Sequence, residues 1–426
     1  MKQSKIYRTL LLFLPLTVYA QINFSGDIHP SKMYRTSDQS EISLPFRLAK
    51  LNAGYTFGNL DIITNTALEY RWSTGEGEVD LREAYLAWYP DWGEVKLGKQ
   101  IHAWGAVDGN NPTDNLNPYD YYFMFLPGAD RKIGTVSGSI KTYWNDWQLE
   151  AVFIPGHEPN RLPFGEEDFP ISLPFEPERF EPVEREYEFG FRLQTSVLEN
   201  DVSVSWFRGN DRSFSLLGVD VFFDGMGGII GPDQHFGFRT TDVFGVDVVG
   251  FVSEFTYRGE LAYFKTETHI NDSWYIRLPS TAEYAQYVMQ VEYSGLWDIQ
   301  WNGQLIGSSV ISVQGLAPNM SNLMSPVELT QDNFQPGMGT PFAMFTDLGA
   351  MLSASATLFD NRLEIKANSF IDLKETGVMF GGQVVYSPIE NLNVELGISQ
   401  FTGEEESKLK EMEDFSHINL GVKYSF

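Results

Sequence analysis

The sequence predicts an all-β protein, an antiparallel transmembrane β-barrel of about 18 strands, with about 16 strands as the alternative. Three observations lead to this prediction: an N-terminal export signal, short segments in which apolar and polar residues alternate, and a last segment that ends on an aromatic residue. Beyond the N-terminus there is no apolar run of about 20 residues, the length that a membrane-spanning helix needs. Barrel strands mix apolar and polar residues, so a barrel is compatible with this absence.

The N-terminus has the layout of a signal peptide. Three basic residues precede an apolar run over residues 9–18, and a small-residue cleavage pattern occupies residues 18–20. We therefore expect a cleaved signal peptide over residues 1–20 and a mature chain, residues 21–426, that forms a single barrel. An uncleaved anchor helix is the weaker alternative, because the apolar run is too short to span a bilayer.

The composition excludes several classes of function. The chain has no cysteine, which excludes a disulfide framework, a thiolate metal site, a cysteine nucleophile and a lipoprotein. Its net charge of -27 becomes -30 once the three basic residues of the signal are removed. This acidity makes nucleic acid an implausible partner and disfavours simple attraction to anionic lipid.

The last segment, residues 415–426, shows the alternation most clearly. Its apolar face carries Ile418, Leu420, Val422, Tyr424 and Phe426, and its polar face carries His417, Asn419, Gly421 and Lys423. A terminal aromatic residue on such a strand resembles the signal read by the outer-membrane assembly machinery. We therefore expect that machinery as a partner and the bacterial outer membrane as the location.

Four further segments alternate in the same way, at residues 147–153, 186–193, 362–368 and 391–401. In a soluble sandwich the apolar face would turn inward. In a membrane barrel it faces lipid, and the polar face lines the lumen.

The links between these segments favour the membrane barrel. Two-residue turns such as Gly58-Asn59 and Asn145-Asp146 alternate with much longer links, as in barrels with short periplasmic turns and long outer loops. Both termini then lie on the short-turn side, which requires an even number of strands. Residues 210–258 are where a hairpin is hardest to place, and this leaves the two strand counts open.

Aromatic residues gather where predicted strands meet turns. They are Tyr70, Trp72, Trp88, Tyr89, Trp92, Trp144, Trp147, Trp297 and Trp301. Interfacial girdles of a barrel would place them there, although ordinary strand propensity is an alternative.

The link over residues 103–132 combines turn formers with aromatic residues, as in Asp108-Gly109-Asn110 and Asn117-Pro118-Tyr119. A segment of this kind can fold inward and narrow a barrel, whereas the alternative is an outward loop with its own packing. We expect an inward-folded constriction. Its candidate residues are Lys99, Gln100, Trp104, Asp108, Asn117, Asp120, Arg131 and Lys132.

The same region resembles a motif of large Gram-negative barrels related to alginate-export-type channels, and of an uncharacterised outer-membrane family found beside RND-type exporters. The resemblance covers roughly residues 79–132 and is carried by Leu97-Gly98-Lys99-Gln100, Trp104-Gly105, Asn117-Pro118 and Asp120. The family commonly has Arg at the position of Lys99, and Lys cannot make the same bidentate contact. The resemblance implies a barrel of about this size that transports a solute across the outer membrane. It does not fix the substrate.

An acidic link, residues 155–186, has two interpretations. Its carboxylates could bind divalent cations that bridge the loop to lipopolysaccharide. The favoured alternative is a solvated acidic loop, because the carboxylates lack the spacing of a ligand set.

The sequence offers little support for an enzyme. Its six histidines form no metal pair, and there is no HExxH, GxSxG or phosphate-binding loop. His102 and Asp108 could form a dyad, but no nucleophile follows from the sequence. We expect neither catalysis nor a cofactor.

The predicted lumen face is polar and carries both signs of charge. Its candidate pore-lining residues are Arg71, Glu69, Lys141, Glu188, Arg192, Glu260, Glu292, Glu364, Lys366, Glu395 and Lys423. A polyanion channel would need an excess of lumen Arg and Lys, so alginate is not carried over as the substrate. Opposite charges on neighbouring strands could also pair and simply brace the wall.

Two functions follow from these observations. The first is an outer-membrane channel that passes a small or amphipathic solute, with an inner-membrane exporter as a possible partner. The second is a plugged structural or anchoring barrel that binds through acidic outer loops. In both cases outer-membrane lipid and lipopolysaccharide are the expected surroundings.

Overall fold

A computed structural model of the chain describes residues 21–426, except for residues 171–175, 224–228, 296–297, 320–321 and 323–324. The predicted signal peptide, residues 1–20, and Trp297 lie outside the described residues. In the described part of the chain, no helix is long and apolar enough to cross a membrane.

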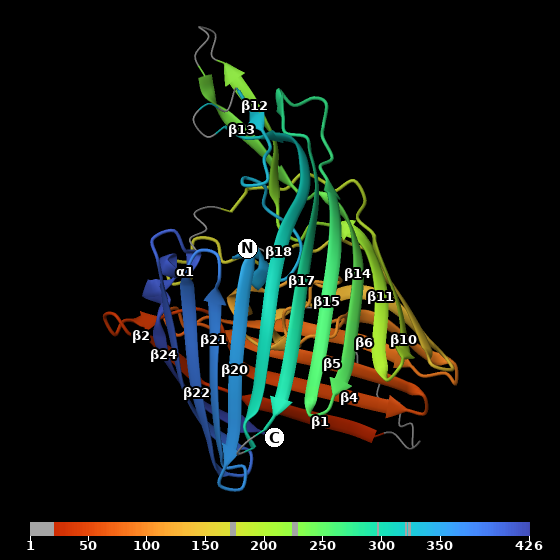
Figure 1. Cartoon of the computed structure of the whole chain (residues 1–426), viewed down its shortest axis with the longest axis vertical. Coiled ribbons are helices and arrows are strands. Elements are labelled where there is room, and N and C mark those ends of the chain that lie inside the picture. Colours follow the sequence, from red (N-terminus) through yellow and green to blue (C-terminus); the bar gives the residue numbers. More distant parts are fainter. Residues whose placement is uncertain (1–20, 171–175, 224–228, 296–297, 320–321, 323–324) are drawn as a thin grey trace, which may run out of the picture.

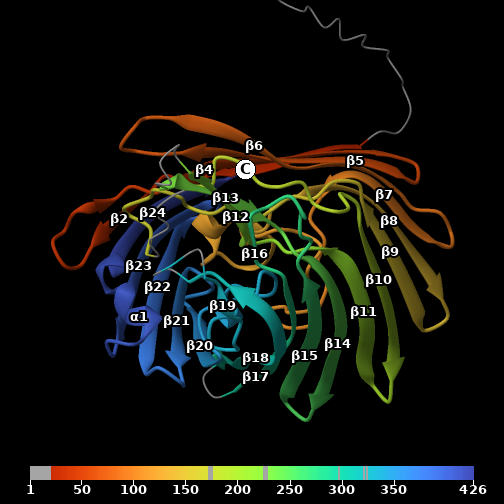
Figure 2. The ribbon, with the colours of Figure 1, turned by 90° about the horizontal axis from the view of Figure 1, so that it is seen from above.

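Within the described residues, eighteen long strands form one closed antiparallel barrel (Figures 1 and 2). In chain order they are β1 (Gln21–Ile28), β4 (Phe46–Phe57), β5 (Leu60–Tyr70), β6 (Gly77–Trp88), β7 (Gly93–Gln100), β8 (Thr135–Trp144), β9 (Trp147–Ile154), β10 (Glu188–Val197), β11 (Asn200–Asn210), β14 (Thr240–Val252), β15 (Phe255–Glu267), β17 (Ser280–Ser294), β18 (Gln300–Ala317), β20 (Leu348–Leu358), β21 (Leu363–Asp372), β22 (Gly377–Ile389), β23 (Leu392–Gly403) and β24 (His417–Ser425). The prediction of about 18 antiparallel strands is confirmed.

The remaining elements are short and belong to the connections. They are β2 (Ser31–Arg35), β3 (Glu41–Ile42), β12 (Ser215–Phe223), β13 (Ile229–Gly237), β16 (Ile276–Arg277), β19 (Val327–Glu328), α1 (Lys408–Glu411) and the 3-10 turns η1 (Tyr121–Phe123), η2 (Gly128–Arg131), η4 (Phe342–Met344) and η5 (Glu413–Phe415). The hairpin that the sequence left unplaced is β12–β13. It pairs with β16 in a separate small sheet and projects beyond the barrel wall (Figure 1).

The barrel is closed by two short strands that act as one. β1 pairs with β4 from Gln21↔Thr56 to Ile28↔Ala49, and its last two residues also pair with β24. β2 continues the pairing with β24 from Ser31↔Gly421 to Arg35↔His417. Pro30 separates the two strands, at a position where it has no amide hydrogen to give to the ladder. Its carbonyl still accepts a hydrogen bond from the Val422 amide, so the seam stays paired.

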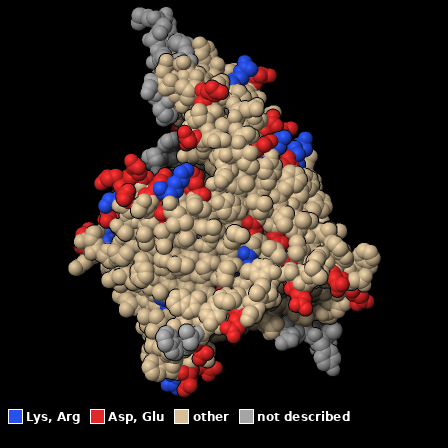
Figure 3. Space-filling view, viewed as in Figure 1, with Lys and Arg blue, Asp and Glu red and all other residues tan. Residues whose placement is uncertain are grey.

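The two faces of the wall differ as the alternation predicts. In β24, Leu420 and Val422 are 49% and 43% exposed on the outer face, whereas His417 is buried on the lumen side. The other strands also expose large apolar side chains outward, such as Met289 and Leu352. The face in Figure 3 accordingly shows a broad area with few charged atoms between the two ends of the barrel. Such a surface suits the hydrocarbon core of a membrane.

The connections also divide as predicted. Tight turns, among them Gly58-Asn59, Asn145-Asp146 and Glu390-Asn391, lie at one end together with Gln21 and Phe426, which we call the short-turn end. Asn145 and Asn391 adopt positive φ there, as two-residue hairpins require. All long links leave from the opposite, long-loop end. Exposed aromatic rings lie near both ends, including a Trp88–Trp92 pair at the short-turn end.

Neighbouring residues in β22 provide a test of the two faces. Val384 faces outward, whereas Gln383 faces the lumen and lies 3.4 Å from the Glu395 carboxylate. Val384→Arg should lower the free energy of unfolding by about 2–4 kcal/mol, because it places a charge in lipid. Gln383→Arg should lower the free energy of unfolding much less, because the new guanidinium can pair with the Glu395 carboxylate. Urea unfolding of the barrel in lipid vesicles measures both, and equal costs would contradict the assignment of faces.

Candidate functional site

Residues 101–134, the connection between β7 and β8, enter the lumen and cross it. We call residues 101–134 the inward segment. Seen from above, the space inside the barrel wall is occupied by connecting segments (Figure 2). At its far point the Asp108 amide donates to Gln290 Oε1 in β17 (2.8 Å), and Gln304 Nε2 in β18 donates to the Asp108 carbonyl (2.8 Å). The Asn110 amide reaches Met351 Sδ in β20 at 3.1 Å. The segment therefore spans from the β7–β8 wall to a remote part of the barrel.

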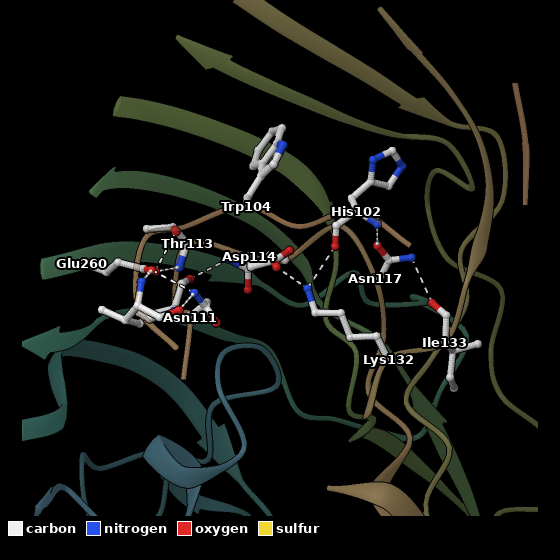
Figure 4. A network of polar contacts seen from close by, with 12 residues as sticks. His102, Trp104, Asn111, Thr113, Asp114, Asn117, Lys132, Ile133 and Glu260 are labelled. Carbon is white, nitrogen blue, oxygen red and sulfur yellow. Dashed lines mark hydrogen bonds and ion pairs between the residues drawn. The ribbon is translucent and has the colours of Figure 1, made fainter. Parts of the chain in front are cut away.

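A single carboxylate on β15 anchors the first half of the inward segment (Figure 4). Glu260 Oε1 accepts hydrogen bonds from the amides of Ala106 and Val107, the latter at 2.8 Å, and from Asn111 Nδ2 at 3.0 Å. Glu260 Oε2 accepts from the Thr113 hydroxyl at 2.8 Å. Hydrogen bonds to a charged group are stronger than neutral ones, so several contacts of this half converge on one strong acceptor.

Asn117 and Lys132 connect the two ends of the inward segment (Figure 4). Asn117 Oδ1 accepts from the His102 amide (2.6 Å), and its Nδ2 donates to the carbonyls of Gln100 and Ile133. Lys132 Nζ donates to the His102 carbonyl and forms an ion pair with Asp114. Apart from Ile133, which is half-buried, the side chains of these residues are buried, which gives the segment a fixed shape at its base.

Cations of the wall receive the returning half of the segment. Arg47 donates to the Asp130 carbonyl, Arg82 donates to the Ala129 carbonyl (2.7 Å), and Lys50 pairs with the Asp130 carboxylate (2.9 Å). Bulges in β4 and β6 aim these side chains inward, because the register shifts beside Arg47 and at Arg82. Strict alternation could not predict this, and neither arginine was among the sequence candidates.

A second connection, residues 329–347 between β18 and β20, also enters the lumen. The amides of Arg212 and Ser213 donate to the Gly337 carbonyl, and the Thr340 amide donates to Gln286 Oε1 in β17 (3.0 Å). The Thr340 hydroxyl contacts Asn110 of the inward segment. From the sequence, this link is predicted only as one of the long links between strands. Its run of Gly337, Gly339 and nearby aromatic residues was the available signal.

The acidic link, residues 155–186, is attached to the barrel by specific ion pairs. Glu166 pairs with Arg71, Asp168 pairs with Arg35 (2.7 Å), and Arg161 bridges Glu69 (2.8 Å) and Asp120 (3.1 Å). Burial raises the pKa of Asp120 to about 6, against the opposing effect of Arg161. Among the described residues, no group of carboxylates and histidines has the arrangement of a metal site. The described carboxylates Glu166 and Asp168 thus pair with arginines.

The structure places seven of the eight constriction candidates inside the barrel. Gln100, Trp104, Asp108, Asn117, Asp120, Arg131 and Lys132 lie in or beside the inward segment, and Trp104 Nε1 donates to Glu150 in β9 (3.2 Å). Lys99 lies elsewhere: its register partner in β8 is Val136, which is exposed on the outer face. Lys99 follows the alternation of Leu97 and faces outward, so it does not line the lumen.

The pore-lining candidates are mostly paired. Lys141–Glu150, Arg258–Glu292 and Lys423–Asp27 are pairs between neighbouring strands, and Arg192 of β10 reaches across β11 to Asp247 of β14. Lys366 pairs with Glu364 of its own strand, and Glu395 contacts His29. Glu69, Glu188 and Glu260 instead hold connections, with Glu188 receiving Arg212 in a bidentate pair. Arg71 lies beyond the end of β5 and contacts the acidic link. The alternative in which opposite charges brace the wall therefore describes many of these residues.

The fold and site together define a barrel of the transmembrane type whose lumen is crossed by two connections. No protein-family model matches the chain, and no curated protein matches it in sequence. Among solved structures, the chain is similar to Pseudomonas aeruginosa OccK5 (OpdH), with a TM-score of 0.49, 10% identity and coverage of 95% of this chain and 98% of that chain. It is also similar to a BenF-like porin from Pseudomonas fluorescens Pf-5, with a TM-score of 0.49 and 10% identity. That match covers 96% of this chain and 98% of the porin.

OmpT, an outer membrane protein of Vibrio cholerae, gives a TM-score of 0.42 at 11% identity, with 96% of this chain and 98% of that chain covered. At these values the likenesses transfer neither a function nor a substrate, and the fold assignment rests on the strand pairings described above.

Acid should loosen the base of the inward segment through His102. This side chain is buried beside the Ser137 hydroxyl (2.9 Å), and burial together with Lys132 lowers its pKa to about 3. An unfolded histidine binds a proton near pH 6.5, so the stabilising contribution is present above that pH and is lost as the pH falls toward 3. Between pH 7.5 and 4.5 the loss should be on the order of 2 kcal/mol. Hydrogen exchange over residues 101–134, corrected for intrinsic rates, measures it.

Matched variants separate His102 from the other titrating groups. His102→Gln should reduce the acid sensitivity of residues 101–134, whereas His269→Gln, which changes an exposed histidine in another loop, should leave it unaltered. Asp120 acts with the opposite sign, since its raised pKa favours the folded state as the pH falls. Identical acid sensitivity in the parent and in His102→Gln would contradict the assignment.

Proposed function

We propose that this chain is an outer-membrane channel for small solutes, and that the inward segment controls passage at its long-loop end. One observation carries the proposal: the segment crosses the lumen and is attached to the far wall mainly by Glu260, Gln290 and Gln304. Hydrogen bonds of this kind exchange for water at a modest net cost, so such an attachment can be released without unfolding the wall.

The polar lumen toward the short-turn end supports the same function. Its charged pairs, such as Lys366–Glu364 and Lys423–Asp27, retain partial exposure, which suits a water-filled vestibule. At the long-loop end, the inward segment and residues 329–347 pack together through Asn110–Thr340 and Phe125–Phe342. The proposed channel therefore has a wide polar side and a narrow side.

A plugged anchoring barrel is the second candidate, and one observation favours it. Tyr121, Met124 and Phe342 of the connections form a buried apolar cluster with Phe370 and Phe401 of the wall. Apolar packing of this kind is costly to expose and would resist opening. In this case the exposed acidic residues of the long-loop end would provide the binding surface.

The surroundings of the channel follow from the same proposal. Outer-membrane lipid would cover the apolar outer face, lipopolysaccharide would contact the long-loop end, and the assembly machinery would recognise β24 with its terminal Phe426. Participation of an inner-membrane exporter, which the resemblance of residues 79–132 implies, stays a prediction. So does the relationship to alginate-export-type channels.

Planar-bilayer conductance of the refolded mature protein tests the channel. The parent should conduct weakly, and removal of residues 105–129 should raise the single-channel conductance strongly, because it removes the chain that crosses the lumen. Glu260→Gln is the finer variant: it weakens the anchor and should raise the conductance or its open fraction several-fold. Glu364→Gln, a lumen carboxylate away from the segment, should not.

The two candidate functions separate in this experiment. A folded barrel that stays silent in the parent, in the deletion and in Glu260→Gln would favour the plugged barrel. Resistance of the protein to unfolding in detergent before heating confirms that each variant is folded.

A further inference from the structure

We propose that Arg131 and Tyr119 form a binding site for a small oxyanion, such as a carboxylate or phosphate, inside the inward segment. The proposal rests on the proposed channel function, since it names the chemical class of solute that the constriction would select. Its evidence is a buried cation without an acceptor.

Arg131 is the exceptional arginine of the lumen. Its side chain is 4% exposed, yet its guanidinium forms no hydrogen bond or ion pair with the described residues. The other buried arginines of the described residues find acceptors: Arg47 and Arg82 bind carbonyls of the segment, and Arg212 binds Glu188. A buried charge without a partner is costly, so the site has a strong preference for an anion.

The charges around Arg131 do not balance. The carboxylate that acts on Arg131 electrostatically is Asp114, which is itself paired with Lys132 (Figure 4). Arg131, Lys132 and Asp114 are all at most 7% exposed and together carry one excess positive charge. This excess lies within a chain whose net charge is -27, so its position inside the lumen is a local feature and not a reflection of composition. One bound anion would neutralise it.

Two neighbours give the site its shape. The buried Tyr119 ring lies 5.7 Å from the Arg131 guanidinium carbon, and its hydroxyl forms no hydrogen bond with the described residues. Gly109 adopts a φ of +93°, and a Cβ there would lie 3.2 Å from Arg131 Nη2. Glycine therefore leaves the guanidinium edge uncovered. The planar guanidinium edge matches the two oxygens of a carboxylate or two oxygens of a phosphate, and the Tyr119 hydroxyl is a further donor in the same part of the segment.

The site differs from the other charged groups of the lumen. Arg192, Arg258 and Lys423 already have carboxylate partners on other strands of the wall, so an anion would have to displace those partners. Arg131 needs no such displacement. It also belongs to the inward segment itself, next to the Gly109 turn whose neighbour Asp108 binds the far wall.

Equilibrium dialysis of the refolded, detergent-solubilised barrel tests the site directly, with acetate and inorganic phosphate as probes at constant ionic strength. We expect one site per chain for at least one probe. Arg131→Gln should weaken binding roughly tenfold or more, because it removes a charged donor, and Tyr119→Phe should weaken it about three- to tenfold. Lys366→Gln removes one lumen cation elsewhere and should leave binding unchanged.

The outcomes are decisive in either direction. Absence of binding in the parent, or equal binding in the parent and both site variants, would overturn the site. Tyr119→Phe retains the ring and the charge, so it tests the proposal even if Arg131→Gln fails to fold. Preference for phosphate over acetate, or the reverse, identifies the source of the oxyanion. Binding that depends on Arg131 in a barrel that is silent in bilayers would keep the site and reject the channel.

Discussion

Closure of the backbone hydrogen-bond ladder is the constraint on which the rest of this structure depends. Lipid offers no partner to a backbone amide or carbonyl, so each wall strand must be paired along both edges. At the seam, β1 and β2 share the task of pairing with β24 on either side of Pro30. Once the wall has used its backbone groups in this way, only the connections remain free to build a site. The long ones all leave from one end, so that end carries the site.

Charge pairing follows a gradient along the barrel axis. Toward the short-turn end, lumen charges pair within the wall, as Lys423 does with Asp27 on the adjacent strand. Toward the long-loop end, wall charges pair with connections, as Glu69 does with Arg161 and Glu188 with Arg212. The wall can therefore balance its own charge in one half only. In the other half, connections must be present to neutralise buried carboxylates, which explains why so much chain is held inside the barrel.

The sequence predicts the wall well because alternation depends only on which face meets lipid. The outward series from Ile418 to Tyr424 and the lumen position of Glu395 both follow from period two. The prediction of which side chains face inward fails where a bulge interrupts the alternation. At Arg82 such a bulge turns the arginine side chain into the lumen, next to Glu83 in the sequence. The prediction for Lys99 is wrong for a different reason. A motif placed Lys99 among the constriction residues, although its alternation with the outward-facing Leu97 indicates that it faces lipid.

The connections are harder to predict because their positions are set by partners distant in sequence. The mixture of aromatic and turn residues in residues 103–132 indicates an inward segment. No local pattern, however, identifies Glu260 as its anchor, because Glu260 lies more than 140 residues after the residues that it binds. Residues 329–347 carry a weaker signal, since glycines such as Gly337 and Gly339 are common in outer loops. Here they are needed because Asp211 and Gln286 would collide with any side chain at these positions.

The two halves of the inward segment are held by different forces, and this difference determines where it can move. Apart from Val107, residues 106–113 depend on polar contacts with Glu260, Gln290 and Gln304. In the other half, Tyr119, Tyr121 and Met124 belong to a buried apolar cluster. Water can replace the polar contacts at small net cost, but separating the apolar cluster exposes its whole surface. Movement therefore begins in the polar half. Gly109 lies in that half beside the unpaired guanidinium of Arg131, so an anion that binds there acts on the part of the segment that is easiest to displace.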